Sequence, residues 1–133
     1  MKTLIVEDEF TSRALLREIL KRFGPPKIAM NGREGVELAR AAIEAGEPFD
    51  LICLDIVMPE MDGQEALKRI RALEADAGID PQRRAKVIMT TALADRDTVV
   101  EAINSQCDYF LVKPIDARIL MEELRRLGLV PQN

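Results

Sequence analysis

The sequence predicts a doubly wound α/β protein, in which a five-stranded parallel sheet carries helices on both faces. The first observation is an alternation of short apolar runs with longer segments whose apolar residues recur at helical spacing, which indicates consecutive strand–helix units. The second is that the apolar runs are nearly uninterrupted, as expected for strands buried on both faces of a sheet. The clearest such runs occupy residues 3–6, 51–54, 87–89 and 109–112.

Five strands and five helices follow from this pattern. The predicted strands span residues 3–6, 27–30, 50–55, 86–91 and 109–112. The predicted helices span residues 10–24, 34–46, 63–78, 95–105 and 116–127, and a polar loop covers 79–85. Gly24 and Pro25–Pro26 stop the first helix, and Asn31–Gly32 forms a turn before the second.

The last two helices carry start signals. Asp95 and Asp116 are predicted N-cap residues, because a carboxylate can accept hydrogen bonds from the unpaired amides of a first helical turn. Ile115 and Leu120 are placed to form a hydrophobic staple around the second of these caps.

Composition narrows the class of protein. The chain has 133 residues, 47% hydrophobic and 32% charged, so we expect a single domain over residues 1–133 with a core at about 2–127. Only six residues follow Leu127, so we expect no output domain. The net charge of −4 argues against nucleic acid as a direct partner. No apolar run reaches the roughly 18 residues of a membrane helix, which argues against membrane insertion.

The start of the chain and its side-chain inventory point to the cytoplasm. The opening MKTLIVEDE has acids where a signal peptide would have its cleavage region. Cys53 lies within an apolar run and is predicted to be a small buried hydrophobe. The chain has no histidine, which excludes Ser-His-Asp triads and histidine acid–base chemistry and argues against zinc.

Charged and hydroxyl side chains follow the predicted strands. The first strand ends at Glu7–Glu9, the third at Asp55, the fourth at Thr90–Thr91 and the fifth at Lys113–Pro114. Ligands of open parallel sheets bind beyond the carboxyl ends of the strands. We therefore expect a cluster of carboxylates, a hydroxyl and an ammonium at one edge of the sheet.

This cluster favours phosphoryl chemistry on a carboxylate. Carboxylates as close as Glu7, Asp8 and Asp55 repel one another, and Mg²⁺ is suited to a site with carboxylates, waters and a phosphoryl oxygen. Asp55 beside the metal and Lys113 could attack phosphorus and form an aspartyl phosphate. The hydroxyl of Thr91 could donate a hydrogen bond to the transferred group.

Four motifs extend this interpretation to a family. LIVEDE, LDIVMPEMDG, TTA and YFLVKP occur in order over essentially the whole chain. With these motifs the chain resembles response-regulator receiver domains of two-component systems, and in particular the chemotaxis regulators that consist of a single receiver. The resemblance implies a flavodoxin-like fold with strand order 2-1-3-4-5.

The resemblance assigns the phospho-acceptor and the metal ligands. It implies that Asp55 is phosphorylated and that Asp8 binds Mg²⁺ directly. Glu7 would bind the metal through water, and the backbone carbonyl of Val57 would be a further ligand. Mn²⁺ is a possible substitute for Mg²⁺. Where the family often has two aspartates, this chain has Glu7 before Asp8.

The resemblance also assigns a switch. Lys113 would contact the phosphoryl group and Asp55, while Thr91, which precedes the small Ala92, would move toward the phosphate. Phe110 would turn inward behind it, and Tyr109 would face the other way along its strand. Because Phe110 replaces the commoner tyrosine, it could pack at the output face without donating a hydrogen bond.

One further feature concerns the backbone. The resemblance implies a cis peptide bond between Lys113 and Pro114, and only an X–Pro bond adopts the cis form at small cost.

The implied function is that of a stand-alone response regulator. A histidine kinase or a histidine phosphotransfer protein would supply the phosphoryl group. The surface of the fourth helix, fifth strand and fifth helix would then change its affinity for an unidentified output protein. Such a protein is not an enzyme beyond its own phosphorylation and dephosphorylation. A phosphorelay shuttle and a phosphate sink remain open alternatives to an effector.

Three rivals come from other classes. Haloacid-dehalogenase-like phosphotransferases place a second carboxylate two residues after the nucleophile, whereas this chain has Val57 there. Receiver-like interaction modules that are not phosphorylated typically lose the acceptor or the lysine, and both Asp55 and Lys113 are present. A flavodoxin-like cofactor binder would need a phosphate-cradling loop after the first strand, and EDEFTSR is too acidic for one.

Overall fold

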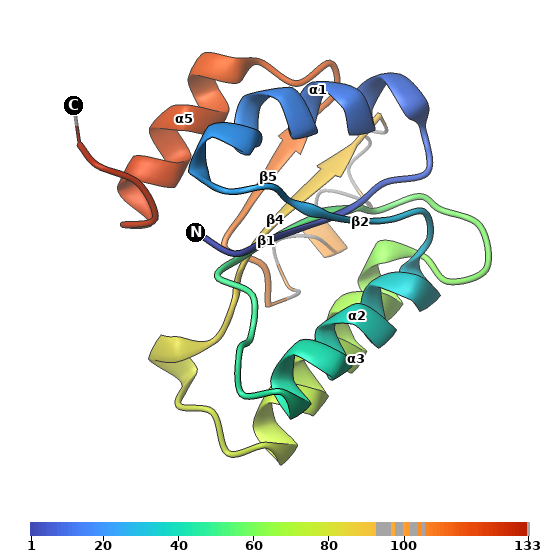
Figure 1. Cartoon of the computed structure of the whole chain (residues 1–133). Coiled ribbons are helices and arrows are strands. Elements are labelled where there is room, and N and C mark those ends of the chain that lie inside the picture. Colours follow the sequence, from blue (N-terminus) through green and yellow to red (C-terminus); the bar gives the residue numbers. More distant parts are fainter. Residues whose placement is uncertain (93–96, 98–99, 102–103, 105, 133) are drawn as a thin grey trace.

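The computed structural model describes residues 1–92, 97, 100, 101, 104 and 106–132. Its centre is a five-stranded sheet in the order β2-β1-β3-β4-β5, and every neighbouring pair is parallel (Figure 1). The strands are β1 (Thr3–Val6), β2 (Lys27–Ala29), β3 (Leu51–Asp55), β4 (Lys86–Thr91) and β5 (Tyr109–Val112). The predicted fold class and strand order are therefore confirmed.

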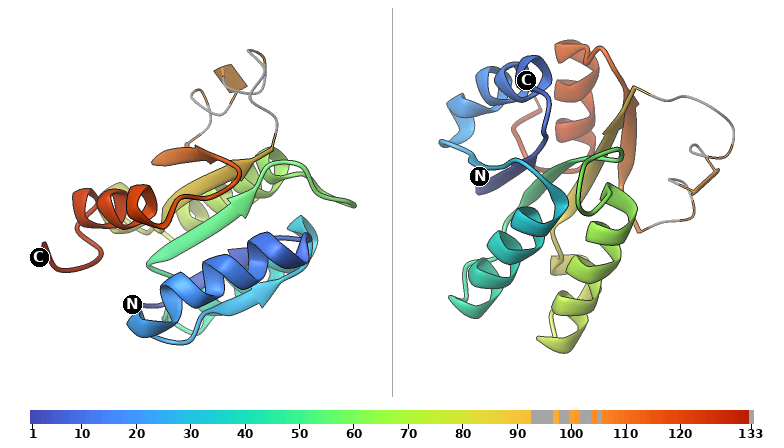
Figure 2. Two further views of the ribbon diagram at one scale, coloured as in Figure 1. Left: turned by 90° about the horizontal axis from the view of Figure 1, so that it is seen from above. Right: turned by 90° about the vertical axis from the view of Figure 1, so that its right-hand side faces the viewer.

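Helices cover both faces of the sheet. They are α1 (Phe10–Leu20), α2 (Gly32–Glu44), α3 (Gly63–Asp76) and α5 (Ala117–Arg126). Helices α1 and α5 lie on one face and α2 and α3 on the other, as Figures 1 and 2 show. Within the described residues, none of the helices has both the length and the apolar character needed to cross a membrane.

The structure corrects several predicted helix ends. The first helix stops at Leu20 instead of residue 24, and the short 3₁₀ helix Lys21–Phe23 follows it. The second helix starts at Gly32, inside the predicted turn, because the Oδ1 of Asn31 accepts the Glu34 amide at 2.9 Å and caps the helix. The predicted polar loop 79–85 contains the 3₁₀ helix Pro81–Arg83.

The remaining ends differ from prediction by two residues or fewer. Strand β2 ends at residue 29 and β3 begins at residue 51, while α2 ends at 44, α3 at 76 and α5 spans 117–126. Asp116 caps α5 as predicted, accepting the Arg118 amide at 2.8 Å. Of the helix predicted over 95–105, only residues 97, 100, 101 and 104 are described, so its bounds and the predicted cap Asp95 lie outside the described residues.

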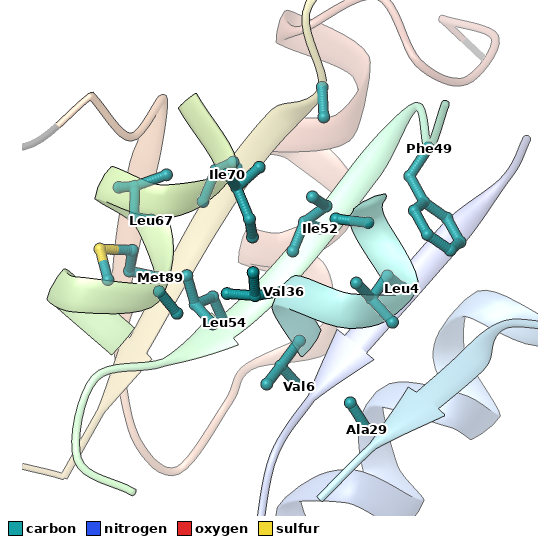
Figure 3. Close-up of a cluster of buried hydrophobic side chains, with 14 of the residues drawn as sticks. Leu4, Val6, Ala29, Val36, Phe49, Ile52, Leu54, Leu67, Ile70 and Met89 are labelled. Atoms are coloured by element: carbon teal, nitrogen blue, oxygen red, sulfur yellow. The ribbon is translucent and has the colours of Figure 1, made fainter. Parts of the chain in front are cut away.

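Two apolar clusters hold these layers together. The first cluster packs the sheet against α2 and α3, and Figure 3 shows Val36, Leu67 and Ile70 of these helices meeting strand residues such as Leu54 and Met89. The second cluster packs the opposite face against α1 and α5. It contains both members of the predicted staple, and Cys53, in which burial raises the pKa of the thiol to about 12. Cys53 is thus a small core residue, as predicted.

The loop after β3 returns closely to the end of that strand. The amide of Gly63, at the start of α3, donates a hydrogen bond of 2.7 Å to the carbonyl of Ile56. A Cβ at position 63 would clash with the backbone carbonyl oxygen of Asp55. Glu60 in this loop has a positive φ of 68°. Glycine at position 63 therefore permits a close approach that fixes the start of α3 beside Asp55.

We expect Gly63→Ala to destabilise the protein by about 3 kcal/mol, which is at the upper end of the range for adding a methyl group to a packed site. The cost should be this high because the added Cβ would clash with backbone atoms of Asp55, which cannot move aside as a flexible side chain could. Urea unfolding followed by circular dichroism would measure the change. Glu65→Ala, at an exposed position two residues further along α3, is the matched control and should change stability by less than about 0.5 kcal/mol. Equal stability of the two variants would contradict the close approach.

Candidate functional site

Side chains from three strand ends converge at the carboxyl edge of the sheet. Glu7 and Asp8 follow β1, Asp55 ends β3, and Lys113 follows β5. Strands β1 and β3 are adjacent, and Val6 of β1 pairs with Leu54 of β3. The residues that follow this pair, Glu7 and Asp55, therefore lie side by side. The strand order therefore brings together the residues that sequence analysis placed at this edge.

Lys113 bridges two buried carboxylates. Its Nζ lies 2.8 Å from Oε1 of Glu7 and 3.3 Å from Oδ2 of Asp55. The side chains of Lys113, Glu7 and Asp55 are 14%, 1% and 5% exposed. Burial lowers the pKa of Lys113, but the carboxylates of Glu7 and Asp55 outweigh this effect and raise it overall. The ammonium therefore stays charged at neutral pH.

The pKa of Asp55 is raised from 3.8 to about 7. Burial is the largest cause of the increase, followed by the hydrogen bond and the negative charge of Glu7. The charge and the hydrogen bond of Lys113 act in the opposite direction and offset only part of the increase. A carboxyl group with this pKa is only partly ionised at neutral pH. A further cation at the site would favour the ionised form.

The carboxylates of Glu7, Asp8 and Asp55 could supply that cation site. Each offers one oxygen, and these oxygens all lie within 4.8 Å of one another. Asp8 is exposed, whereas Glu7 and Asp55 are buried. Hard oxygen donors with excess negative charge fit Mg²⁺. The family resemblance also implies that the backbone carbonyl of Val57 is a metal ligand. Val57 lies two residues after Asp55, and its side chain is exposed.

The acidic loop after β1 is held by contacts that sequence analysis missed. The amide of Glu9 donates to Oε2 of Glu7 at 3.1 Å. The Nη1 of Arg13 donates to the carbonyl oxygens of Glu7 and Asp8 at 3.3 and 3.2 Å. The first bond orients the Glu7 carboxylate, and the other two hold the backbone that carries Glu7 and Asp8. The contact of Arg13 could have been predicted from its position in the sequence. It lies in the first turns of the helix that directly follows the acidic loop, so its long side chain can reach back to that loop.

Glu9 also caps α1. Its carboxylate accepts from the hydroxyl of Ser12 and from the amides of Ser12 and Thr11 at 2.8 to 2.9 Å. The Ser12 hydroxyl, and then these amides, lower the pKa of Glu9 to about 2. Sequence analysis did not identify this cap, since glutamate is not among the usual N-cap residues.

The two threonines of β4 lie on different faces of the sheet. Side chains alternate along a strand, so Thr90 faces the side of Ile88, in the second cluster, and Thr91 faces the side of Met89, in the first. Thr90 pairs with Asp55 in the strand register. Thr91 is the last residue of β4, is fully buried, and its carbonyl accepts the Lys113 amide at 2.7 Å.

The aromatic residues of β5 divide in the same way. Phe110 packs against the first cluster and Tyr109 against the second, which confirms that they face opposite ways. Thr91 and Phe110 therefore lie on the same side of adjacent strands. Ala92 follows Thr91 and is exposed. The peptide bond between Lys113 and Pro114 is cis, the form expected at this position.

A parallel sheet of this order, with an acid pair, a central aspartate and a lysine at its carboxyl edge, defines a receiver class of signalling domain. The family model for the response regulator receiver domain matches residues 3–125. The chain belongs to this family.

Similar proteins include chemotaxis regulators and receivers of larger proteins. The chemotaxis protein CheY of Listeria monocytogenes is 36% identical over 126 residues, which cover 95% of this chain and 97% of that protein. The chain spans 12% of the length of the probable histidine kinases 2 from the two rice subspecies that it also matches.

Two solved complexes contain similar folds. One is the CheX–CheY–BeF₃–Mg²⁺ complex from Borrelia burgdorferi, with a TM-score of 0.79, 26% identity and coverage of 98% of this chain and 90% of that chain. The other is the complex of the Saccharomyces cerevisiae histidine phosphotransfer protein Ypd1 with the receiver domain of Ssk1. Its TM-score is 0.80 with 28% identity, and the match covers 96% of this chain and 88% of that chain.

We expect Asp55→Asn to make the metal-free protein more stable near and above pH 7. The folded-state pKa of about 7 lies above the ordinary 3.8, so the ionisation of Asp55 removes stability from the wild type as the pH rises from about 4 through 7. An amide does not ionise and avoids this loss. The difference between 3.8 and about 7 limits the gain to about 4 kcal/mol.

Urea unfolding in a chelator, at several pH values from about 4.5 to 8, would measure this gain. The advantage of Asp55→Asn should grow with pH and level off above about 7. Asp97→Asn, at an exposed position, is the control and should show no such growth. Parallel pH profiles of the wild type and Asp55→Asn would show instead that Asp55 is ionised over the whole range.

Proposed function

We propose that this chain is a phospho-acceptor in which Asp55 receives a phosphoryl group from a phosphohistidine of a partner protein. The observation that carries this proposal is the position of the Asp55 carboxylate. It is buried between two further carboxylates and the ammonium of Lys113, at 3.3 Å, at the carboxyl edge of a parallel sheet. These 133 residues contain no histidine, so the phosphoryl group has to come from a donor outside them.

The proposed transfer is a substitution at phosphorus, in which the Asp55 carboxylate is the nucleophile and the donor imidazole is the leaving group. A carboxylate oxygen of Asp55 forms a bond to phosphorus while the bond from phosphorus to the donor nitrogen breaks, and the electron pair of that bond stays on the imidazole. Lys113 lies where it would neutralise charge on the phosphoryl oxygens. Positioning and charge neutralisation are the main requirements of phosphoryl transfer.

The carboxylates of Glu7, Asp8 and Asp55 would hold Mg²⁺. The metal would offset their mutual repulsion and polarise the phosphoryl group. The donor set supports this assignment, because oxygens of these three residues lie within 4.8 Å of one another and Asp55 is hard to ionise without a further cation. The similar CheX–CheY complex from Borrelia burgdorferi also contains Mg²⁺.

Phosphorylation would change the local balance of charge. A phosphoryl group on Asp55 adds close to two negative charges, and the Lys113 ammonium, now shared by Glu7 and Asp55, would turn toward it. Thr91 would approach the phosphate, and Phe110 would follow because the two side chains lie on the same side of adjacent strands.

The output surface would lie along β5 and α5. A groove of about 640 Å³ runs there, lined by Tyr109–Val112, Pro114, Asp116 and Ile119. Val112 and Ile119 in this groove are 45% and 41% exposed. Phe110 also lines the groove, so its movement would alter the surface that an output protein meets.

Partners of similar proteins support the choice of donor. A receiver with the same fold is crystallised with the histidine phosphotransfer protein Ypd1, and relatives include probable histidine kinases. We therefore propose a histidine kinase or phosphotransfer protein as the donor for this chain. We also propose that the chain catalyses no reaction beyond its own phosphorylation and dephosphorylation. The residue two positions after Asp55 is Val57, whereas haloacid-dehalogenase-like phosphotransferases place a second carboxylate there.

We expect the wild type to gain one phosphoryl group on incubation with Mg²⁺ and acetyl phosphate, and Asp55→Asn to gain none. Intact-mass spectrometry would measure the gain. Asp50→Asn is the matched control, because Asp50 immediately precedes the other end of β3, is exposed, and its carboxylate accepts the amide of Lys2. This control should be phosphorylated like the wild type. A phosphoryl group of equal yield on Asp55→Asn would overturn the assignment.

We expect Mg²⁺ to raise the Tm of the wild type and to raise that of Asp8→Asn much less. Asp8 contributes an exposed carboxylate to the cluster, so its loss should weaken the metal site without disturbing the core. Binding at about 100 times the Kd stabilises a folded protein by about 2.7 kcal/mol. Thermal unfolding at increasing Mg²⁺ would test this, with Asp50→Asn again as the control. A Mg²⁺ response that Asp8→Asn leaves unchanged would place the metal elsewhere.

A further inference from the structure

A second charged cluster lies at the opposite end of the sheet, around Arg71 of α3. The side chain of Arg71 is only 9% exposed and pairs with Glu74 at 2.8 Å and with Asp108 at 3.5 Å. It also donates to the carbonyl oxygen of Ala85 at 2.8 Å, and through Nε and Nη2 to that of Gln106 at 3.1 and 2.8 Å. We call these residues the Arg71 clamp.

The clamp fixes the starts of β4 and β5. Glu74 accepts the amide of Ala85, just before β4, at 2.8 Å. Asp108, just before β5, accepts the amide of Val87 through Oδ2 at 2.7 Å and donates its own amide to the Val87 carbonyl at 2.8 Å. Strand β5 lies at the edge of the described sheet, so within that sheet it forms backbone hydrogen bonds with β4 only. The clamp therefore supplies a second attachment.

The position of the clamp relates it to the proposed switch. Phe110 lies two residues after Asp108 and packs against the cluster to which Leu67 and Ile70 of α3 belong. The other end of α3 begins beside Asp55, where the Gly63 amide donates to the Ile56 carbonyl at 2.7 Å and a Cβ at position 63 would clash with the Asp55 backbone. One helix, α3, thus contacts the loop that follows Asp55 at its start and, through Arg71, the backbone just before β5.

The chemistry of the clamp favours positioning over simple stabilisation. Burying an ion pair is costly, and apolar side chains of similar volume often stabilise a protein equally well. A guanidinium differs in its planar, directional set of donors, which selects one arrangement of its partners. Arg71 directs these donors to backbone carbonyls before two strands.

We infer that Arg71 is a positioning residue of the switch, which holds the start of β5 still so that phosphorylation of Asp55 is converted into movement of the Phe110 ring. This inference rests on the proposed function. Without the clamp, β5 could shift as a whole and absorb the displacement at Thr91. Loss of the clamp should therefore leave the chemistry at Asp55 intact and reduce the response of Phe110.

Fluorine NMR would test this inference. The chain has four phenylalanines, so uniform labelling with 4-fluorophenylalanine gives four signals, and Phe110→Leu identifies the one from Phe110. The probe is beryllium fluoride with Mg²⁺, a tetrahedral mimic of a phosphoryl group on a carboxylate. In Arg71→Met we expect half-saturation within about twofold of the wild type, and a Phe110 shift change less than about half as large.

Three further variants separate positioning from general stability. Arg69→Met is the matched control, because Arg69 lies on the same helix but forms an exposed ion pair with Glu65. It should respond like the wild type. Arg71→Lys keeps the charge without the fork of donors and should respond weakly. Asp108→Asn keeps an acceptor for the Val87 amide while removing the charge that faces Arg71, and it serves as the test if Arg71→Met does not fold.

The outcomes are distinct. A full Phe110 response in Arg71→Met and Asp108→Asn, with only a lowered Tm, would overturn the inference and leave the clamp a stabilising feature. A large loss of beryllium fluoride affinity in these variants would also overturn it, since Arg71 would then act on the site itself. If the wild type failed to bind beryllium fluoride, the proposed function and the inference would both fall.

Discussion

The crowding of three carboxylates around one ammonium is the constraint on which the site depends. Glu7 and Asp55 are buried beside Lys113, and Asp8 lies next to them at the surface. The Lys113 ammonium offsets their charge only in part, and burial, followed by the neighbouring Glu7, raises the pKa of Asp55 to about 7. A fold that buries such a group must hold it from several strands at once, and the order β2-β1-β3-β4-β5 does so by placing β1 next to β3.

The sequence was sufficient for the features that depend on local pattern. Apolar runs predicted all five strands, and alternation along β5 predicted the opposite orientations of Tyr109 and Phe110. The sequence was insufficient to predict contacts between residues that are far apart in the chain. Arg71 looks like an ordinary exposed arginine, since its partners Gln106 and Asp108 are distant in the sequence, the first by 35 residues. The early start of α2 was missed because a turn and an N-cap share the same residue types.

The two faces of the sheet separate the proposed phospho-acceptor from the proposed switch residues. Asp55 lies in register with Thr90, whose side chain faces α1 and α5, whereas Thr91 and Phe110 face the α2 and α3 side. In the proposed switch, a change at Asp55 would therefore have to pass from one face of the sheet to the other. The hydrogen bond from the Lys113 amide to the Thr91 carbonyl offers a short route, because one residue contacts Asp55 through its side chain and Thr91 through its backbone.

The charged clusters at the two ends of the sheet differ in how completely they are satisfied. Around Arg71, both carboxylate oxygens of Glu74 and Oδ2 of Asp108 accept hydrogen bonds from backbone or guanidinium donors, so nothing in the cluster favours rearrangement. Around Asp55, one ammonium serves two buried carboxylates and the carboxyl is hard to ionise. In the proposed function, the unsatisfied cluster would gain free energy from a metal and a phosphoryl group, while the satisfied one would resist displacement. A switch needs both, because a local change in charge moves a distant side chain only when the backbone between them stays in place.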